Sequence, residues 1–148
     1  MMKKRKVDGG FTLLELMIVI VILGILGAVV APMLMDEPDK ARVTQAKLQL
    51  ENFSTAIKKF YLDNGFYPST DQGLEALVEK PASGRSPKNY PENGYMAKIP
   101  QDPWGNDYSY VAPGRNSPFE IVSYGADGAE GGEGFDADLY NADVPERR

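Results

Sequence analysis

Glu15 is the acidic residue with the most unusual surroundings, because it stands at the start of a long apolar run. Residues 16–35 carry no formal charge, and the four residues before Glu15 are also uncharged. An ionised carboxylate among hydrocarbon side chains in a membrane costs on the order of several kcal/mol unless it is paired, and such residues are functional by default. The alternative is a side chain that reaches back to the lipid headgroups from one turn inside the helix. We expect a pairing role for Glu15.

A second candidate for chemistry is the acidic, glycine-rich segment at residues 123–138. The longer stretch of residues 116–146 holds eight carboxylates and no Lys or Arg. Glycines let the backbone turn its carbonyls inward, and Ca²⁺ takes about six to eight carboxylate and carbonyl oxygens in flexible geometry. The spacing is not that of an EF-hand. The alternative is a solvated acidic loop.

Composition excludes most other chemistry. The 148 residues include no His and no Cys. Thiol nucleophiles, disulfides, imidazole bases and the usual transition-metal ligands are therefore absent, and a bound ion should be a hard one held by oxygen. The net charge of −5 argues against a nucleic-acid partner, since neutralising phosphates needs a basic face.

Charge is distributed in three blocks along the chain. Residues 1–10 contain four basic and one acidic side chain, residues 16–35 contain none, and residues 36–148 contain 12 basic and 19 acidic ones. An uncharged run of this length can cross a bilayer as a helix, and the basic leader predicts a cytoplasmic N-terminus. We therefore expect a leader at residues 1–10, a transmembrane helix at 11–35 and one head domain at 36–148.

A cleaved secretory signal peptide is the other explanation of this N-terminus. The apolar run is longer than the 7–15 residues of a typical signal core. Its small-residue cleavage site at residues 29–31 would also leave Pro32 directly after the cut. Both features favour an uncleaved anchor. Within the helix, Pro32 removes one backbone hydrogen bond and predicts a kink or local melting.

The helical period continues beyond the apolar run. One apolar stripe recurs at intervals of three and four residues, and Asn64-Gly65 supplies a stop signal. The stripe consists of Val43, Ala46, Leu50, Phe53, Ile57 and Phe60. We expect one long helix from Phe11 to Asp63, interrupted near Pro32 and Pro38, whose second half packs on the head.

The head is expected to be a small α+β unit. Ser69 or Thr70 can cap a short helix that carries the apolar residues of 74–78 and that Pro81 ends. Residues 81–107 have the composition of an irregular loop, with aromatic anchors at Tyr90, Tyr95 and Trp104. Apolar and aromatic residues occupy every second position in residues 106–111 and again in residues 119–124, and a Pro-Gly turn separates the two segments. This pattern predicts an antiparallel hairpin, joined by a third strand. The fold class is α+β, with a long N-terminal helix on a small sheet head, a lollipop shape.

The N-terminal segment GGFTLLEL (residues 9–16) resembles the class III signal of type IV pilins and pseudopilins. The resemblance implies that a prepilin peptidase cuts after Gly10 and methylates the new N-terminus on Phe11. It implies that Glu15 pairs with the N-terminal ammonium of a neighbouring subunit. It also implies that Pro32 accompanies a stretch of helix that loosens inside the filament.

Four head segments resemble the major pseudopilins of the type II secretion system: residues 62–70 (LDNGFYPST), 72–78 (QGLEALV), 102–106 (DPWGN) and 125–128 (GADG). That family binds a structural Ca²⁺ in its C-terminal loop. By position, the resemblance implies Asp127, Asp136, Asp138 and the backbone carbonyl of Tyr124 as ligands, with Glu130 and Glu133 in reserve. The chain departs from the family pattern at Phe135 and after Asp138.

The resemblance implies a structural protein and no enzyme. The chain would be a single-pass protein of the bacterial inner membrane with its head in the periplasm, and it would polymerise into a pseudopilus that moves folded proteins through the outer membrane. Expected partners are further copies of itself, minor pseudopilins, the prepilin peptidase, and an inner-membrane assembly platform with its ATPase. The alternatives are a type IV pilin of a surface filament, or a monomeric, membrane-anchored calcium-binding domain.

Overall fold

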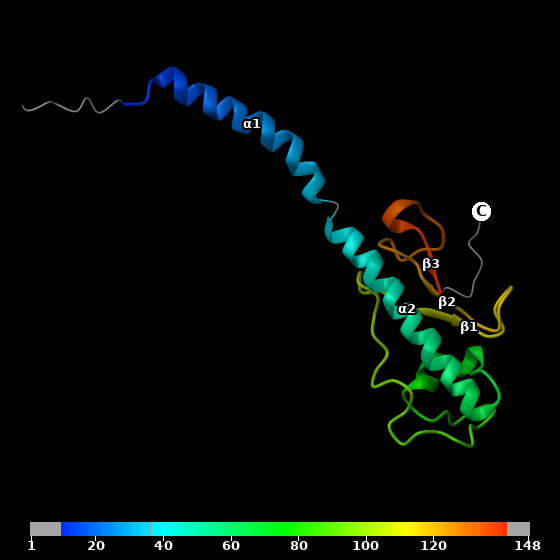
Figure 1. Cartoon of the computed structure of the whole chain (residues 1–148). Helices are drawn as coiled ribbons and strands as arrows, with labels where there is room; N and C mark the ends of the chain where they lie inside the picture. Colours follow the sequence, from blue (N-terminus) through cyan, green and yellow to red (C-terminus); the bar gives the residue numbers. More distant parts are fainter. Residues whose placement is uncertain (1–9, 36, 142–148) are drawn as a thin grey trace, which may run out of the picture. The chain divides into compact units, whose positions relative to one another are not determined.

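The computed structural model describes residues 10–35 and 37–141. The chain divides into two compact units, Met1–Pro38 and Asp39–Arg148, and each is described by itself. The helices and strands follow in the order shown in Figure 1. Most of the predicted leader, residues 1–9, lies outside the described residues.

The first helix, α1, covers Leu13–Met35. All its side chains described up to Val29 are exposed, although nearly all of them are apolar. In the described part of the chain, no helix combines the length and hydropathy of a membrane-crossing segment. The transmembrane assignment of residues 11–35 stays a prediction.

The predicted interruptions of the long helix have different outcomes. Helical structure is continuous across Pro32, so local melting at this residue is not seen. A proline removes only its own N–H from the ladder, and the neighbouring hydrogen bonds can keep the turn closed. Pro38 is the second residue of α2, Glu37–Asn64. Its missing N–H has no helical partner in a first turn, which makes it a start signal.

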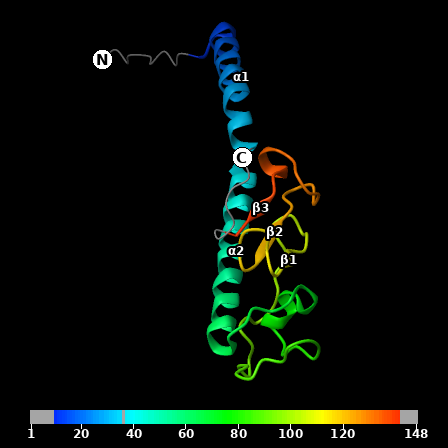
Figure 2. The ribbon, with the colours of Figure 1, turned by 90° about the vertical axis from the view of Figure 1, so that its right-hand side faces the viewer.

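The second helix buries the predicted stripe. Five of its six residues are at most 1% exposed, and Val43, the first, is half-buried. From Leu50 onward these residues pack against the sheet and the 3₁₀ turns in one core. The rings of Phe53 and Tyr108 meet edge to face there, at a centroid distance of 5.0 Å. Figure 2 shows the sheet along one side of α2 and the 3₁₀ turns near its C-terminal end.

The stop signal after α2 is confirmed and is reinforced from the loop. Gly65 has a φ of +75° and donates its N–H to the carbonyl of Tyr61 at 2.7 Å. Asn64 donates to the hydroxyl of Tyr95 at 2.9 Å and accepts from the backbone of Asn89 at 3.0 Å. The irregular loop predicted at residues 81–107 is therefore tied to the helix end by side chains.

The short helix predicted between the cap at Ser69 or Thr70 and Pro81 is instead a pair of 3₁₀ turns, η1 at Thr70–Gln72 and η2 at Leu74–Leu77. Gly73 separates them with a φ of +63°, and a glycine in this region breaks the α-helical path. Ser69 is the cap residue of η1, and its N–H binds the Gln72 side chain. Thr70 exchanges hydrogen bonds with the backbone of Ala112.

The predicted three-stranded antiparallel sheet is confirmed, with shorter strands. The strands β1 (Ser109–Val111), β2 (Glu120–Ser123) and β3 (Leu139–Tyr140) lie in that order. Tyr110 pairs with Ile121, and Val122 pairs with Tyr140. The predicted inner face is buried, and it consists of Tyr108, Tyr110, Phe119 and Ile121. The head is therefore an α+β unit with a single core.

Candidate functional site

The first turn of α1 holds Glu15 in a capped position. Thr12 precedes the helix, and its hydroxyl accepts the backbone N–H of Glu15 at 3.2 Å. A threonine at the N-cap followed three residues later by Glu is the sequence signature of a capping box. Sequence reasoning missed Thr12, although this spacing was the signal that could have found it.

The side chain of Glu15 is exposed, and no described residue of the same chain pairs with its carboxylate. Its neighbours on α1 are apolar and about half or more exposed, as with Leu14 at 67% and Ile18 at 52%. A negative charge near a helix N-terminus is favourable by about 0.3–1 kcal/mol. The arrangement leaves the carboxylate available to a positive group outside the chain.

Gly10 and Phe11 lie before the helix, in chain without helical or strand structure. Phe11 is 85% exposed, and nothing lies within 4 Å of a Cβ built on Gly10. The predicted cleavage junction is thus accessible to another protein. Pro32, the other residue given an assembly role, lies inside α1, and only its backbone is described.

The acidic loop, residues 124–138, closes on itself through its backbone. The N–H of Ala126 donates to the carbonyl of Phe135 at 3.0 Å. A Cβ added to Gly125 would stand 2.7 Å from the backbone of Asp136, and Gly125 has a φ of +65°. Only glycine fits where the two ends of the loop approach so closely.

Two of the predicted calcium ligands bind backbone amides of the same loop. Asp138 accepts the N–H of Gly131 with both carboxylate oxygens, at 3.1 Å each. Asp127 accepts the N–H of Ala129 at 3.1 Å. Asp136 is exposed, and Tyr124 is half-buried at the entrance to the loop. Each carboxylate keeps further lone pairs that could reach a cation.

The predicted ligands do not converge into a ready cation site. Among the described residues, no three acidic side chains lie close enough together to hold a metal ion. The donor set suits a hard cation in its chemistry, because all its atoms are oxygens. The residues present therefore fit Ca²⁺ by type, while their grouping would have to form on binding.

The loop rests on a buried carboxylate that sequence reasoning did not select. Asp102 is 4% exposed. Its Oδ1 accepts the N–H groups of Trp104 at 3.0 Å and Asn106 at 2.8 Å, and its Oδ2 accepts the hydroxyl of Ser123 at 2.7 Å. Asn106 then donates its side-chain amide to the carbonyl of Gly125 at 3.2 Å. Asp102 thus fixes both the residue before the acidic loop and the residue that braces it.

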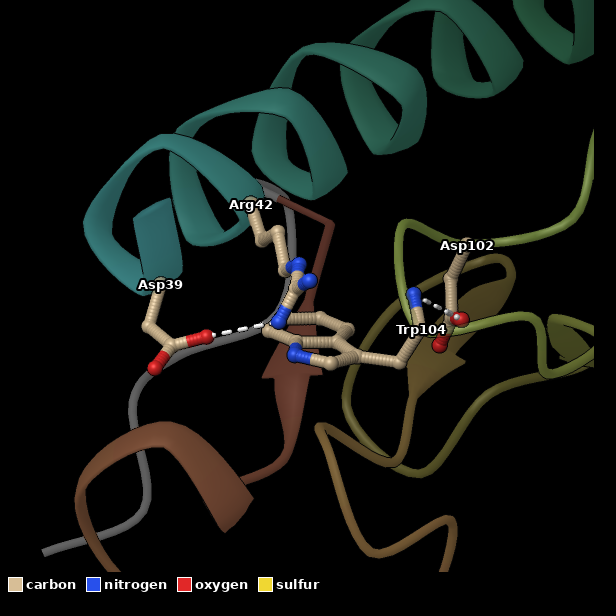
Figure 3. A network of polar contacts seen from close by, with 4 residues as sticks. All are labelled: Asp39, Arg42, Asp102 and Trp104. Atoms are coloured by element: carbon tan, nitrogen blue, oxygen red, sulfur yellow. Dashed lines mark hydrogen bonds and ion pairs between the residues drawn. The ribbon is translucent and has the colours of Figure 1, made fainter. Parts of the chain in front are cut away.

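Trp104, the predicted aromatic anchor, is half-buried in the turn built on Asp102 (Figure 3). Its indole Nε1 is buried and has no hydrogen-bond partner among the described residues. The same view shows Arg42 of α2 donating to Asp39 at 2.8 Å. This pair is partly exposed, and such pairs contribute little to stability.

Comparisons with known proteins identify the family. Residues 33–142 match the family model "Type II secretion system (T2SS), protein G". The chain is 53% identical over 140 residues to the type II secretion system core protein G of Pseudomonas aeruginosa, covering 95% of this chain and 99% of that protein. The chain belongs to the type II secretion system protein G family. The core protein G of Vibrio cholerae is 48% identical over 143 residues, or 97% of each chain.

A solved structure and a motif match agree with this family. The crystal structure of the major pseudopilin from the type 2 secretion system of enterohaemorrhagic Escherichia coli is 41% identical, with a TM-score of 0.65 over 73% of this chain and 92% of that chain. Residues 5–31 match the prokaryotic N-terminal methylation motif. The predicted α+β pseudopilin fold is confirmed, and the chain is a structural pseudopilin subunit of a type II secretion system. The type IV pilin alternative was wrong.

Proposed function

We propose that the chain polymerises through α1 into the periplasmic pseudopilus of its secretion system. One observation carries the proposal: α1 exposes apolar side chains from Leu13 to Val29, around a single carboxylate with no partner in the described part of the chain. An apolar helix surface is stable when it is covered. Copies of the same helix can cover one another, and a repeated head-to-tail contact that does not close produces a filament.

Within this proposal, the remaining machinery acts on the chain from outside. A prepilin peptidase would remove residues 1–10 and methylate Phe11. An inner-membrane assembly platform with its ATPase would add subunits, minor pseudopilins would share the filament, and growth would push folded proteins through the outer membrane. The chain would be a substrate of the peptidase and no enzyme itself. The methylation-motif match supports the processing step.

Before assembly, the apolar run would anchor the chain in the inner membrane, with the head in the periplasm. The sequence supports this location through its 20 uncharged residues after the basic leader. The carboxylate of Glu15 would stay at the membrane border until the N-terminal ammonium of a neighbour pairs with it, which is favourable in a low-dielectric setting.

The experiment that tests the proposed function is a deletion of the gene in its own host. Loss of both the periplasmic filaments and the secreted proteins, restored by the intact chain, is the expected result. Filaments would be scored by electron microscopy and secretion by protein in the medium. Full secretion in the deletion strain would contradict the proposal.

Cleavage after Gly10 gives a direct prediction. The mature protein should lack residues 1–10 and carry the mass of one added CH₂ group on Phe11, as intact-mass analysis of the native membrane fraction will report. Gly10→Val should block both changes, because a branched side chain fills the space at the cut that glycine leaves open. Gly9→Val, one residue further away, is the matched control. Normal processing of Gly10→Val would reject this cleavage site.

A structural Ca²⁺ in the acidic loop remains a proposal. The side chains of Asp127, Asp136 and Asp138, with the carbonyl of Tyr124, would hold it. The cation would offset the repulsion among the loop carboxylates, which have no basic neighbour in sequence. Support comes from the glycine-rich, closed backbone and from the all-oxygen donor set. Because the aspartates are not grouped now, binding should also order the loop.

A thermal melt of residues 36–148 tests this proposal. A ligand that binds only the folded state at a concentration about 100 times its Kd stabilises by about 2.7 kcal/mol. For a domain of this size, the melting temperature should rise by several degrees in Ca²⁺ over EDTA. Mg²⁺ should do much less, since it requires a tight octahedral shell. Asp127→Ala should remove most of the shift, and identical curves in EDTA and Ca²⁺ would leave only a solvated loop.

A further inference from the structure

A shallow groove of about 460 Å³ runs between α2 and the segment at residues 95–100. Its lining combines apolar and basic side chains, and it includes Asn52, Thr55, Lys59, Tyr95, Met96 and Lys98. No acidic residue belongs to this lining. Both lysine side chains are exposed, and in the described part of the chain neither forms an ion pair. The groove therefore presents positive charge on an apolar floor.

The face of α2 that borders the groove carries exposed leucines at both ends. Leu48 is 57% exposed and Leu62 is 80% exposed. With the groove residues Asn52, Thr55 and Lys59 they are spaced by four, three, four and three residues, so all five share one helix face. This stripe is separate from the buried core stripe of α2. The core of the head does not use this face.

The acidic loop has the complementary charge. Residues 124–138 contain five carboxylates and no basic side chain. Glu133 is exposed, and within the described residues its carboxylate forms no hydrogen bond and no ion pair; only its backbone carbonyl accepts one, from Asp136. It is also outside the proposed set of calcium ligands, so a bound cation would leave its charge available. In the view of Figure 1 the loop and the 95–100 segment lie on different sides of α2.

Complementary patches built from different elements produce a particular kind of assembly. If a patch on one copy binds a different patch on the next copy, the contact is heterologous and repeats without closing into a dimer. That is the symmetry a filament requires. Opposite charges on the two patches would also steer subunits into one register and disfavour others.

We propose that the lysine-bearing groove between α2 and residues 95–100 binds the acidic loop of a second copy of the chain. The contact joins neighbouring heads, with Lys59 and Lys98 facing carboxylates that include Glu133. This inference rests on the proposed function, since it requires the chain to polymerise. It adds a head-to-head contact to the assembly through α1.

Cysteine cross-linking tests the contact without background, because the chain contains no Cys. Full-length Lys98→Cys and Glu133→Cys chains, tagged to differ in mass, are produced together and oxidised in assembled filaments. We expect disulfide-linked dimers that contain one copy of each. Asp71→Cys, an exposed acidic position outside both patches, replaces Glu133→Cys as the matched control. The Lys98–Glu133 pair should exceed it several-fold.

Charge reversal provides the second measurement. Lys59→Glu with Lys98→Glu should shorten filaments, and Glu130→Lys with Glu133→Lys should do the same, while all four changes together restore their length. Both effects should weaken at high salt. Normal filaments with cross-linking no higher than the Asp71 control would overturn the inference and leave polymerisation intact. An absence of filaments from the unaltered chain would overturn the inference and the proposed function together.

Discussion

Replacing Glu15 with Val is expected to abolish filament assembly while leaving the head folded. The residue lies in the first turn of α1, in a unit separate from the head. Its carboxylate has no partner in the described part of the chain, so the substitution breaks no contact seen within one subunit. In the filament, however, it would leave the ammonium of a neighbouring subunit unpaired in an apolar setting, which is strongly unfavourable.

Two further substitutions separate charge pairing from a local effect on the helix start. Glu15→Gln keeps a residue that can complete a capping box with Thr12 but removes the charge. If Glu15 acts by pairing, Glu15→Gln should fail to form filaments, as Glu15→Val is expected to. If it acts only by capping, it should assemble. Leu14→Val is the control for a β-branched residue in the same turn, and it should form filaments.

The measurements are filament yield by electron microscopy and the melting temperature of each variant. Glu15→Val should melt like the unaltered chain, because the head core contains no residue of α1. A normal yield of filaments from Glu15→Val would refute the pairing role. A lowered melting temperature would instead mean that Glu15 contributes to folding.

The parts of the fold that sequence predicted correctly are those with a regular burial pattern. The stripe on α2 recurs with the helical period, and the five residues from Ala46 to Phe60 are all buried. The alternating apolar residues of the hairpin likewise predicted that Tyr110 and Ile121 face the core, and both are buried. In these elements one face is buried over several turns or residues. The spacing of the apolar residues therefore identifies both the type of element and its buried face.

The features that sequence did not predict depend on contacts between distant residues. Thr70 was a candidate cap, but its hydroxyl bonds the backbone of Ala112, 42 positions away. The short helix that it was to begin is split by Gly73, whose positive φ depends on the surrounding chain. Local spacing contains no information about such partners, and tertiary contacts override weak helical propensity.

In the acidic loop, too, some features could be predicted from the sequence and others could not. Its glycines were expected to let the backbone fold tightly, and Gly125 is indeed placed where no side chain fits. Composition did not indicate that backbone amides would take up carboxylates, as Gly131 does with Asp138. Whether the loop holds Ca²⁺ stays a prediction, because residue types define possible ligands and only their arrangement defines a site.

The loop network predicts a large loss of stability for Asp102→Ala. The substitution leaves three donors without their acceptor: the N–H groups of Trp104 and Asn106, and the hydroxyl of Ser123. Leaving a buried polar group unsatisfied costs about 1–3 kcal/mol, and the three groups share one small turn. We expect a total loss of roughly 3–5 kcal/mol.

Such a loss is a large fraction of the stability of a small domain, which is typically about 5–15 kcal/mol. The melting temperature of residues 36–148 should fall by on the order of 10 °C. Asp102→Asn is the matched control, because its Oδ1 can still accept both N–H groups while its amide donates to Ser123, whose hydroxyl can also accept. The Asn variant should therefore lose much less than the Ala variant.

Asp102 also connects stability to the acidic loop, which gives the prediction a second readout. Asn106 is oriented by Asp102 and donates to Gly125 at the loop entrance. In Asp102→Ala this brace should loosen, so any stabilisation by Ca²⁺ should shrink although no proposed ligand has changed. If Asp102→Ala melted as Asp102→Asn does, the buried network would not hold the loop. The exposed carboxylates alone would then have to account for its order.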